Sequence, residues 1–139
     1  LSIIMMLVNR ELPLLLPMQI SIVDVRDVAE AHVRALTMGE NGGRYLTVAG
    51  EMMWSDISKI LKRKYPKRRW PFRQLPYYFA LIVCAFHPRV SVSWAKRHLK
   101  NKLYWDATPA ERDMGMEWKP IDETLIDTIP NILNNNWQK

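Results

Sequence analysis

The strongest constraint on the fold is the alternation of strand and helix patterns over residues 19–64. Residues 19–25 alternate in polarity and are rich in Ile and Val, which predicts a strand. Helix formers follow as far as Leu36, residues 44–49 predict a second strand, and residues 55–64 predict a second helix. Short turns between these segments favour parallel strands with right-handed crossovers. The chain is therefore expected to be an α/β protein.

Two parallel strands need partners for their faces and edges. We expect those partners to lie upstream of Leu1 or in a second subunit, and a first residue other than Met suggests a fragment. After Tyr65 the composition becomes basic, aromatic and rich in Pro. We therefore predict a sheet with its crossover helices over residues 1–64 and a mainly helical domain over residues 65–139. Helices are predicted at 2–10, 108–115 and 122–134, and Pro130 should kink or restart the last one.

Capping patterns indicate where these helices begin. Asp27 has Glu30 three residues later, which is typical of a capping box, and Ser55 precedes the second helix. Thr108 is followed by Pro109 and Glu111, another helix start. Gly115 is expected to end that short helix.

Length and composition exclude several classes of protein. A chain of 139 residues with 48% hydrophobic residues is long enough for one ordinary domain and is not disordered. Its single cysteine, Cys84, excludes an internal disulfide framework and fits a reducing compartment. No stretch of eighteen apolar residues is present, so no membrane-spanning helix is expected. We predict a cytoplasmic protein, with association to a membrane surface left open.

The sequence lacks the common catalytic motifs. It has no glycine-rich phosphate loop, no G-x-S-x-G, no C-x-x-C and no H-E-x-x-H. Cys84 lies in an apolar run, where burial would raise its pKa and leave it inert. Glu30 and His32 are two residues apart on a helix and point to different sides, so no metal site is predicted.

One segment carries nearly all the excess positive charge. Residues 57–105 contain thirteen basic side chains and no acidic one. Binding to nucleic acid is not favoured, because no recognised nucleic-acid module surrounds the segment. An anionic membrane surface is a second interpretation, since an apolar stretch follows the basic one. A buried helix after a solvated cationic loop is the third and is favoured, because charge runs usually face solvent. The membrane interpretation would use the following aromatic residues: Trp70, Phe72, Tyr77 and Tyr78.

Four segments, in order, resemble the C-terminal half of the extended short-chain dehydrogenase/reductases, the NAD-dependent epimerase/dehydratase family. They are Ile22-Val23-Asp24-Val25-Arg26-Asp27-Val28-Ala29-Glu30-Ala31-His32, Gly43-Arg44-Tyr45-Leu46, the segment from Asp106 to Pro120 ending in Trp118-Lys119-Pro120, and Glu123-Thr124-Leu125-Ile126-Asp127-Thr128. The resemblance implies a Rossmann-type sheet, of which this chain would hold the last parallel strands, together with a small substrate-binding domain.

The resemblance also implies what this chain lacks. The family binds NAD or NADP through an N-terminal glycine-rich loop and catalyses hydride transfer with a Tyr-x-x-x-Lys pair. Here Tyr65 is followed four residues later by Arg69, so no catalytic and no cofactor-binding residue is assigned. The missing N-terminal half would be the partner that binds most of the cofactor. The expected function is that of a C-terminal oxidoreductase fragment that contributes walls of the substrate cleft.

One position bears on which branch of the family the chain resembles. Sugar-nucleotide epimerases tend to start the strand with an Arg that grips a phosphate, and the aligned residue here is Ile20. The pattern is closer to dihydroflavonol and aldehyde reductases, which implies a small carbonyl or hydroxy compound as substrate. Candidate cleft residues are Gln19, Trp94 and Arg26, the last of which could instead form a surface ion pair. A sugar-nucleotide epimerase or dehydratase fragment, and a non-catalytic membrane-peripheral or scaffold module, remain alternatives.

Overall fold

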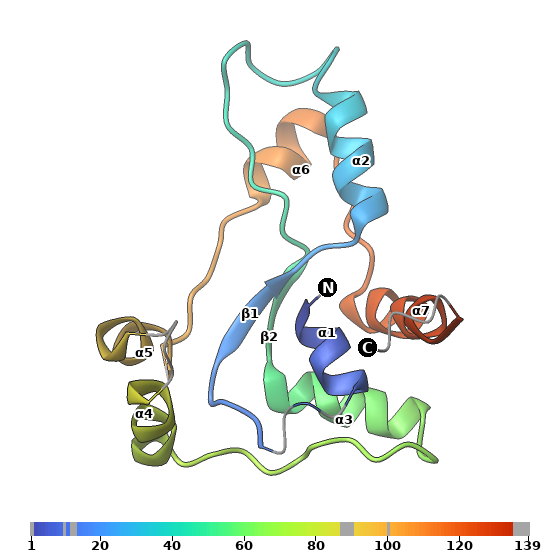
Figure 1. Ribbon diagram of the computed structural model, residues 1–139. Coiled ribbons are helices and arrows are strands. Elements are labelled where there is room, and N and C mark those ends of the chain that lie inside the picture. Colours follow the sequence, from blue (N-terminus) through green and yellow to red (C-terminus); the bar gives the residue numbers. More distant parts are fainter. Residues whose placement is uncertain (1, 10, 12–13, 87–90, 100, 135–139) are drawn as a thin grey trace. The chain divides into compact units, whose positions relative to one another are not determined.

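The computed structural model describes residues 2–9, 11, 14–86, 91–99 and 101–134 (Figure 1). Over those residues the chain is α/β, with a two-stranded sheet and seven helices. In chain order the elements are α1 (Ser2–Val8), β1 (Gln19–Ile22), α2 (Val25–Arg34), β2 (Gly50–Met53), α3 (Trp54–Lys64), α4 (Tyr77–Ala85), α5 (Val92–His98), α6 (Thr108–Met114) and α7 (Ile121–Asn134).

The chain forms two compact units. Unit 1 consists of Leu1–Ile20, Met52–Lys102 and Leu125–Lys139, and unit 2 consists of Ser21–Glu51 and Leu103–Thr124. Unit 2 is therefore made of two segments separated by fifty-one residues of unit 1. The domain boundary expected after residue 64 stays a prediction.

The pairing of β1 with β2 is antiparallel, which corrects the expectation of parallel strands. Ala49 N donates to Ile22 O at 2.9 Å, and Trp54 N donates to Met18 O at 3.2 Å. Later residues of β1 therefore pair with earlier residues of the second strand, so the two strands run in opposite directions (Figure 1). A parallel pairing does occur in unit 1, as an isolated bridge between Leu15 and Gln74.

The second strand was predicted too early. Residues 44–49 have strand-forming side chains but form no strand, and β2 starts at Gly50. Tyr45 explains part of this difference, because its hydroxyl accepts from Glu40 N at 2.8 Å and donates to Asp113 at 3.3 Å. Its ring is held against the core of unit 2 and not in a ladder.

The cores follow the two units. In unit 1, α4 packs on α5 through Ala80, Cys84, Ala95 and Leu99, all buried. Further buried side chains of unit 1 lie on α1, α3 and α7; they are Leu7, Val8, Trp54, Ile57, Leu61, Leu125, Ile129 and Ile132. In unit 2, α2 packs on α6 through a cluster formed by Ala31, Ala110, Met114 and Met116.

The predicted helices are present, but three of their starts differ. Asp24 caps α2, not Asp27, because its carboxylate accepts from Arg26 N and its backbone is extended. The cap position of α3 is Met53 and not Ser55, and that of α6 is Ala107 and not Thr108. Neither Met53 nor Ala107 makes a side-chain hydrogen bond that caps its helix.

The two expected interruptions near the C-terminus turn out differently. Gly115 ends α6 with φ of 62°, as predicted, in the left-handed conformation that favours glycine. α7 continues through Pro130 and does not restart there. Within the described residues, no helix is long and apolar enough to cross a membrane.

Candidate functional site

The four segments of the family pattern meet in unit 2, up to the first turn of α7. Residues 22–32 supply the end of β1 and the start of α2, and residues 43–46 supply the loop that carries Tyr45. Residues 106–120 supply α6 and the turn after it. Thr124, in the last segment, is the residue by which α7 bonds to this group.

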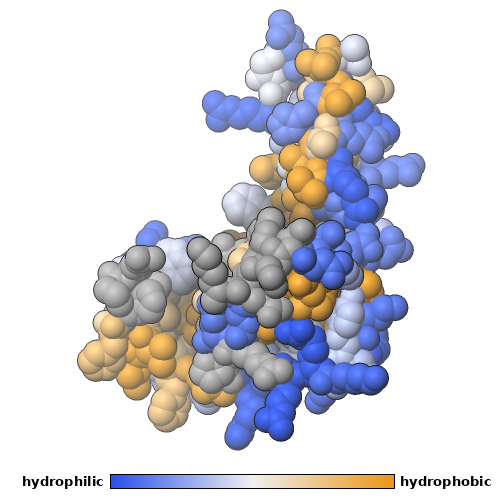
Figure 2. Space-filling view, turned by 45° about the vertical axis from the view of Figure 1, so that its right-hand side comes forward, coloured by the Kyte–Doolittle hydropathy of each residue, from blue (hydrophilic) through white to orange (hydrophobic). Residues whose placement is uncertain are grey.

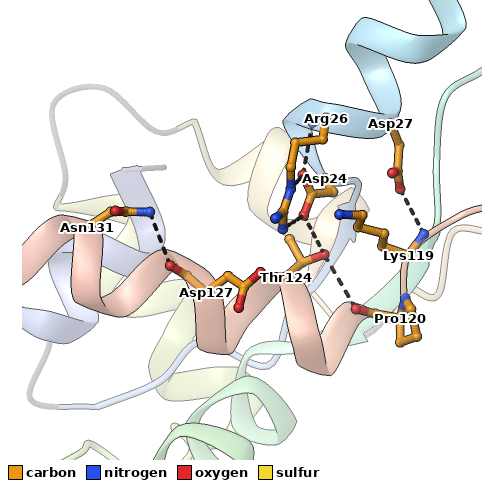
Figure 3. A network of polar contacts seen from close by, with 8 residues as sticks. All are labelled: Asp24, Arg26, Asp27, Lys119, Pro120, Thr124, Asp127 and Asn131. Carbon is orange, nitrogen blue, oxygen red and sulfur yellow. Dashed lines mark hydrogen bonds and ion pairs between the residues drawn. The ribbon is translucent and has the colours of Figure 1, made fainter.

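Asp24 lies at the centre of the contacts between the segments (Figure 3). Its side chain is nearly inaccessible, at 3% exposure of the residue. Its Oδ1 accepts from Arg26 N and from Arg26 Nε, both at 2.9 Å. Its Oδ2 accepts from Arg26 Nη2 at 2.7 Å and from Thr124 Oγ1 at 3.2 Å. One carboxylate thus caps α2, pairs with a guanidinium and bonds to a residue one hundred positions later.

These contacts fix the charge state of Asp24. The hydrogen bond from the Arg26 side chain, helped by those from Arg26 N and Thr124, holds the pKa of the Asp24 carboxyl far below its usual range. Desolvation by burial opposes this shift but does not overcome it. A carboxylate that is ionised and accepts four hydrogen bonds is a poor general base. The geometry therefore assigns Asp24 to holding the segments together.

Asp27 makes a second connection between the same segments. It is 2% exposed, and its Oδ2 accepts from Lys119 N at 2.8 Å. The donor belongs to the Trp118-Lys119-Pro120 turn, and Pro120 O accepts from Thr124 N at 3.2 Å at the start of α7. Asp27 therefore bonds to the turn itself, at Lys119, and Asp24 bonds to Thr124 in the helix that follows the turn.

Arg34 connects α2 to the end of α6. Its Nη1 donates to Met114 O at 3.0 Å and to Gly115 O at 2.5 Å, and its side chain pairs with Glu30 on α2. These carbonyls are among those that a helix leaves without intrahelical partners. A Cβ at Gly115 would lie 3.1 Å from Arg34 Nη1, so the glycine permits both the left-handed turn and the approach of the arginine.

The three predicted cleft residues lie on different elements. Arg26 forms the ion pair with Asp24, although its side chain is 51% exposed. Trp94 lies on α5 in unit 1, half-buried, with its ring stacked on His98 at 4.4 Å between centroids. Gln19 is half-buried at the start of β1. The structure describes these positions but does not test their role in a cleft.

The four aromatic residues of the membrane interpretation differ in exposure. Trp70 is 6% exposed and donates its indole N–H to Tyr65 O at 3.0 Å, so it offers no face to a membrane. Tyr77 is half-buried and packs against the α4–α5 core. Phe72 and Tyr78 are exposed, at 65% and 75%.

Two other kinds of reactive group are the free thiol of Cys84 and clusters of side chains that could bind a metal ion. Cys84 is buried, and burial raises the pKa of its thiol, as expected for an inert residue. Among the residues that the structure describes, no group of three His, Cys, Asp or Glu side chains could hold a metal ion.

Asp24, Arg34 and Thr124 were not among the residues predicted for the site. A signal was present for two of them, because Asp24 and Thr124 both lie inside segments of the family pattern. Spacing alone could not pair residues one hundred positions apart. Arg34 lies beyond the quoted pattern, at the last position of α2.

Comparisons with known proteins identify the relatives. No protein-family model matches the chain. "Putative dihydroflavonol 4-reductase" of Synechocystis sp. is 26% identical over 152 residues, covering 99% of this chain and 44% of the relative. Cinnamoyl-CoA reductase 1 of Petunia hybrida is 27% identical over 112 residues, and cinnamoyl-CoA reductase 2 of Arabidopsis thaliana is 24% identical over 110 residues. Each alignment covers 79% of this chain and 27% of the relative.

The chain is related to the extended short-chain dehydrogenase/reductases. The match lies in the C-terminal part of these family members, and the chain spans less than half of their length. The crystal structure of gox2253 shares the fold, with a TM-score of 0.78 at 20% identity over 99% of this chain and 44% of that one. The family resemblance stated from the four segments is therefore confirmed.

Proposed function

We propose that this chain is the substrate-side portion of an NAD(P)-dependent reductase that acts on a small carbonyl or hydroxy compound. Its contribution is to build part of the substrate cleft and to hold that part in place, and the Tyr-Lys pair comes from elsewhere. The relatives support the reaction class, because those named above are reductases. The absence of a cation at Ile20 supports an uncharged substrate over a sugar nucleotide.

The observation that carries the proposal is the assembly of the four segments in unit 2. Every one of them contributes a group to the contacts of Asp24, Asp27 or Tyr45. Such contacts between distant segments fix the position of backbone and side chains, which is what a substrate-binding lobe requires.

NAD(P) does not fit the residues of this chain alone. The sequence contains no G-x-G-x-x-G, whose glycines allow the backbone to approach a pyrophosphate. We infer that the dinucleotide is bound mainly by residues outside this sequence, and we derive no reaction step through it.

We infer further that the Leu15–Gln74 bridge belongs to the edge of a Rossmann-type sheet. Leu15 N donates to Arg73 O at 3.0 Å, and Leu75 N donates to Leu15 O at 2.8 Å. One residue that bonds on both sides to residues two apart is the pattern of parallel strands. A parallel pairing at this point is compatible with a place in a larger doubly wound sheet.

The decisive experiment is expression of this chain together with its upstream coding sequence. The purified protein should oxidise NADH or NADPH in the presence of a dihydroflavonol or an aromatic aldehyde, followed by nicotinamide absorbance. Gln19→Ala should raise KM by about fivefold, the loss expected for one hydrogen bond to an uncharged group. Gln74→Ala, which removes an exposed amide, is the matched control and should leave KM unchanged.

One result would contradict the proposal, and a second would remove one residue from it. An upstream coding sequence without a glycine-rich strand–helix start and without Tyr-x-x-x-Lys would remove the reductase assignment. A reductase in which Gln19→Ala and Gln74→Ala behaved alike would remove Gln19 from the cleft and leave the reaction class intact.

A further inference from the structure

Helix α4 presents an apolar face to solvent. Tyr78, Ile82 and Phe86 are spaced four residues apart and are 75%, 53% and 86% exposed. Phe79 and Val83 form a parallel row beside them, at 64% and 54% exposure. The core of unit 1 is contacted by a different side of the helix, through Ala80 and Cys84. The name α4 face is used below for Tyr78, Phe79, Ile82, Val83 and Phe86.

The unit that contains this face carries a large net positive charge. Unit 1 holds fifteen Lys and Arg against three Asp and Glu, a net +12, and unit 2 holds five against eleven, a net −6. The fold therefore places most of the basic side chains in unit 1 and most of the acidic side chains in unit 2. The basic side chains of residues 57–102 that are both described and exposed are Lys59, Lys62, Arg63, Lys64, Lys67, Arg69, Arg73, Lys96, Arg97 and Lys102.

One contact in the segment before α4 joins a basic and an apolar side chain. The exposed ring of Phe72 lies under Lys62, with Nζ 5.0 Å from the ring centroid. From Phe72 the chain reaches Pro76, the cap position of α4. Figure 2 shows hydrophobic side chains at the lower left, at the end of unit 1 that contains α4, and hydrophilic side chains along the lower edge of that unit.

From this arrangement we propose that the α4 face and the basic loop before it, residues 65–76, dock unit 1 on an anionic lipid surface. An apolar face inserts into the interface while neighbouring Lys and Arg side chains attract the headgroups. The +12 charge of unit 1 supplies the complementarity to such a surface. Helix α4 is far too short to span a bilayer, so the docking is peripheral.

Two other occupants fit the charges and side chains less well. A second copy placed with the same face inward would bring two +12 units together, which like-charge repulsion opposes. A nucleic acid would match the charge, but no recognised nucleic-acid module surrounds the segment, and the aliphatic Ile82 and Val83 would gain nothing from contact with phosphates.

The test is co-flotation of the full chain with vesicles. Vesicles of equal parts phosphatidylcholine and phosphatidylserine should carry the protein, and vesicles of phosphatidylcholine alone should not. Phe79→Ser combined with Ile82→Ser should reduce the partition coefficient by tenfold or more, because two exposed apolar side chains are lost from the inserted face. Val33→Ser combined with Leu36→Ser, exposed apolar residues of unit 2, is the matched control and should have no effect.

The basic loop is tested separately. Lys67→Gln with Arg69→Gln should weaken binding by about 30-fold, since each Lys or Arg near an anionic surface contributes a factor of about five. Arg44→Gln in unit 2 should leave binding unchanged. All these side chains are exposed, and circular dichroism would verify that each variant stays folded.

Four outcomes would overturn the proposal. These are no flotation with anionic vesicles, flotation that the Phe79/Ile82 variant retains in full, and a protein dimer that the same variant abolishes without any lipid binding. The fourth is binding by this chain that disappears when it is expressed with its upstream coding sequence, which would assign the α4 face to an intramolecular contact.

Discussion

At the scale of single residues, the most consequential finding is how Asp24 is bound. Two oxygens of one buried carboxylate accept from a backbone N–H, a guanidinium and a hydroxyl. Because Arg26 is half exposed, the Coulombic part of its pairing is screened and contributes little. The hydrogen bonds from the Arg26 side chain, from Arg26 N and from Thr124 therefore account for most of the effect on stability.

Asp24→Asn should lower the free energy of unfolding by about 1–3 kcal/mol, because the amide presents N–H groups where the site offers donors. Urea denaturation at neutral pH measures the change. Glu123→Gln, an exposed acidic residue of α7, is the control and should change it by less than about 0.5 kcal/mol.

The same substitution should alter the dependence of stability on pH. The folded pKa of Asp24 lies below its unfolded value, so its stabilisation is complete above the unfolded pKa of about 3.9 and is lost as the pH falls toward the folded pKa. The stability difference between the two proteins should shrink below about pH 4. A difference that stayed constant down to the acid transition would mean that the Asp24 charge has no part in it.

At the scale of elements, the sequence predicted helices better than strands. The spans of α1, α3 and α7 were close, because apolar periodicity and helix propensity are local properties. Residues 44–49 have the Tyr, Leu and Val of a strand, yet β1 pairs with Gly50–Met53. Strand pairing depends on a distant partner, so local β propensity placed the strand too early.

The capping of α2 shows the same limit of prediction from local sequence. Asp24 and Asp27 have similar local patterns, and the capping box favoured the second. The helix instead starts at the first, where Arg26 and Thr124 stabilise the carboxylate. Neither partner can be identified from residue spacing, although the family segments could be recognised without knowing what they contact.

Gly115→Ala should destabilise the junction of α6 with α2 by about 1–2 kcal/mol, because its φ of 62° is unfavourable for a residue with a Cβ. Gly115→Asn should cost less, since Asn tolerates the left-handed region. Thermal unfolding of the two variants provides the comparison. Equal stabilities would indicate that contact with Arg34, and not backbone conformation, dominates at this position.

At the scale of the whole molecule, the two units differ in net charge. Unit 1 carries a net +12, and repulsion among its own side chains opposes its compact state. Unit 2 carries half that charge with the opposite sign, and several of its acids are paired with its own arginines. The two units should therefore respond differently to ionic strength.

Raising the salt concentration from low values to about 0.15 M, where the Debye length is about 8 Å, should stabilise unit 1 more than unit 2. Hydrogen exchange resolved by peptide should show protection in residues 52–102 rising by about fivefold, the equivalent of ~1 kcal/mol. Peptides of residues 21–51 should change less. An equal response in both units would show that net charge does not set their relative stability.

The discontinuity of unit 2 has a consequence for synthesis of the protein. Its first segment ends at Glu51 and its second begins at Leu103, so the ribosome makes all of residues 52–102 in between. At about 5–20 residues per second, this interval lasts ~3–10 s. Until Thr124 emerges, Asp24 lacks the hydroxyl that bonds to it in the finished fold. The nascent chain must therefore carry the β1–α2 segment incomplete through that interval, and this segment is where we expect chaperones to bind first.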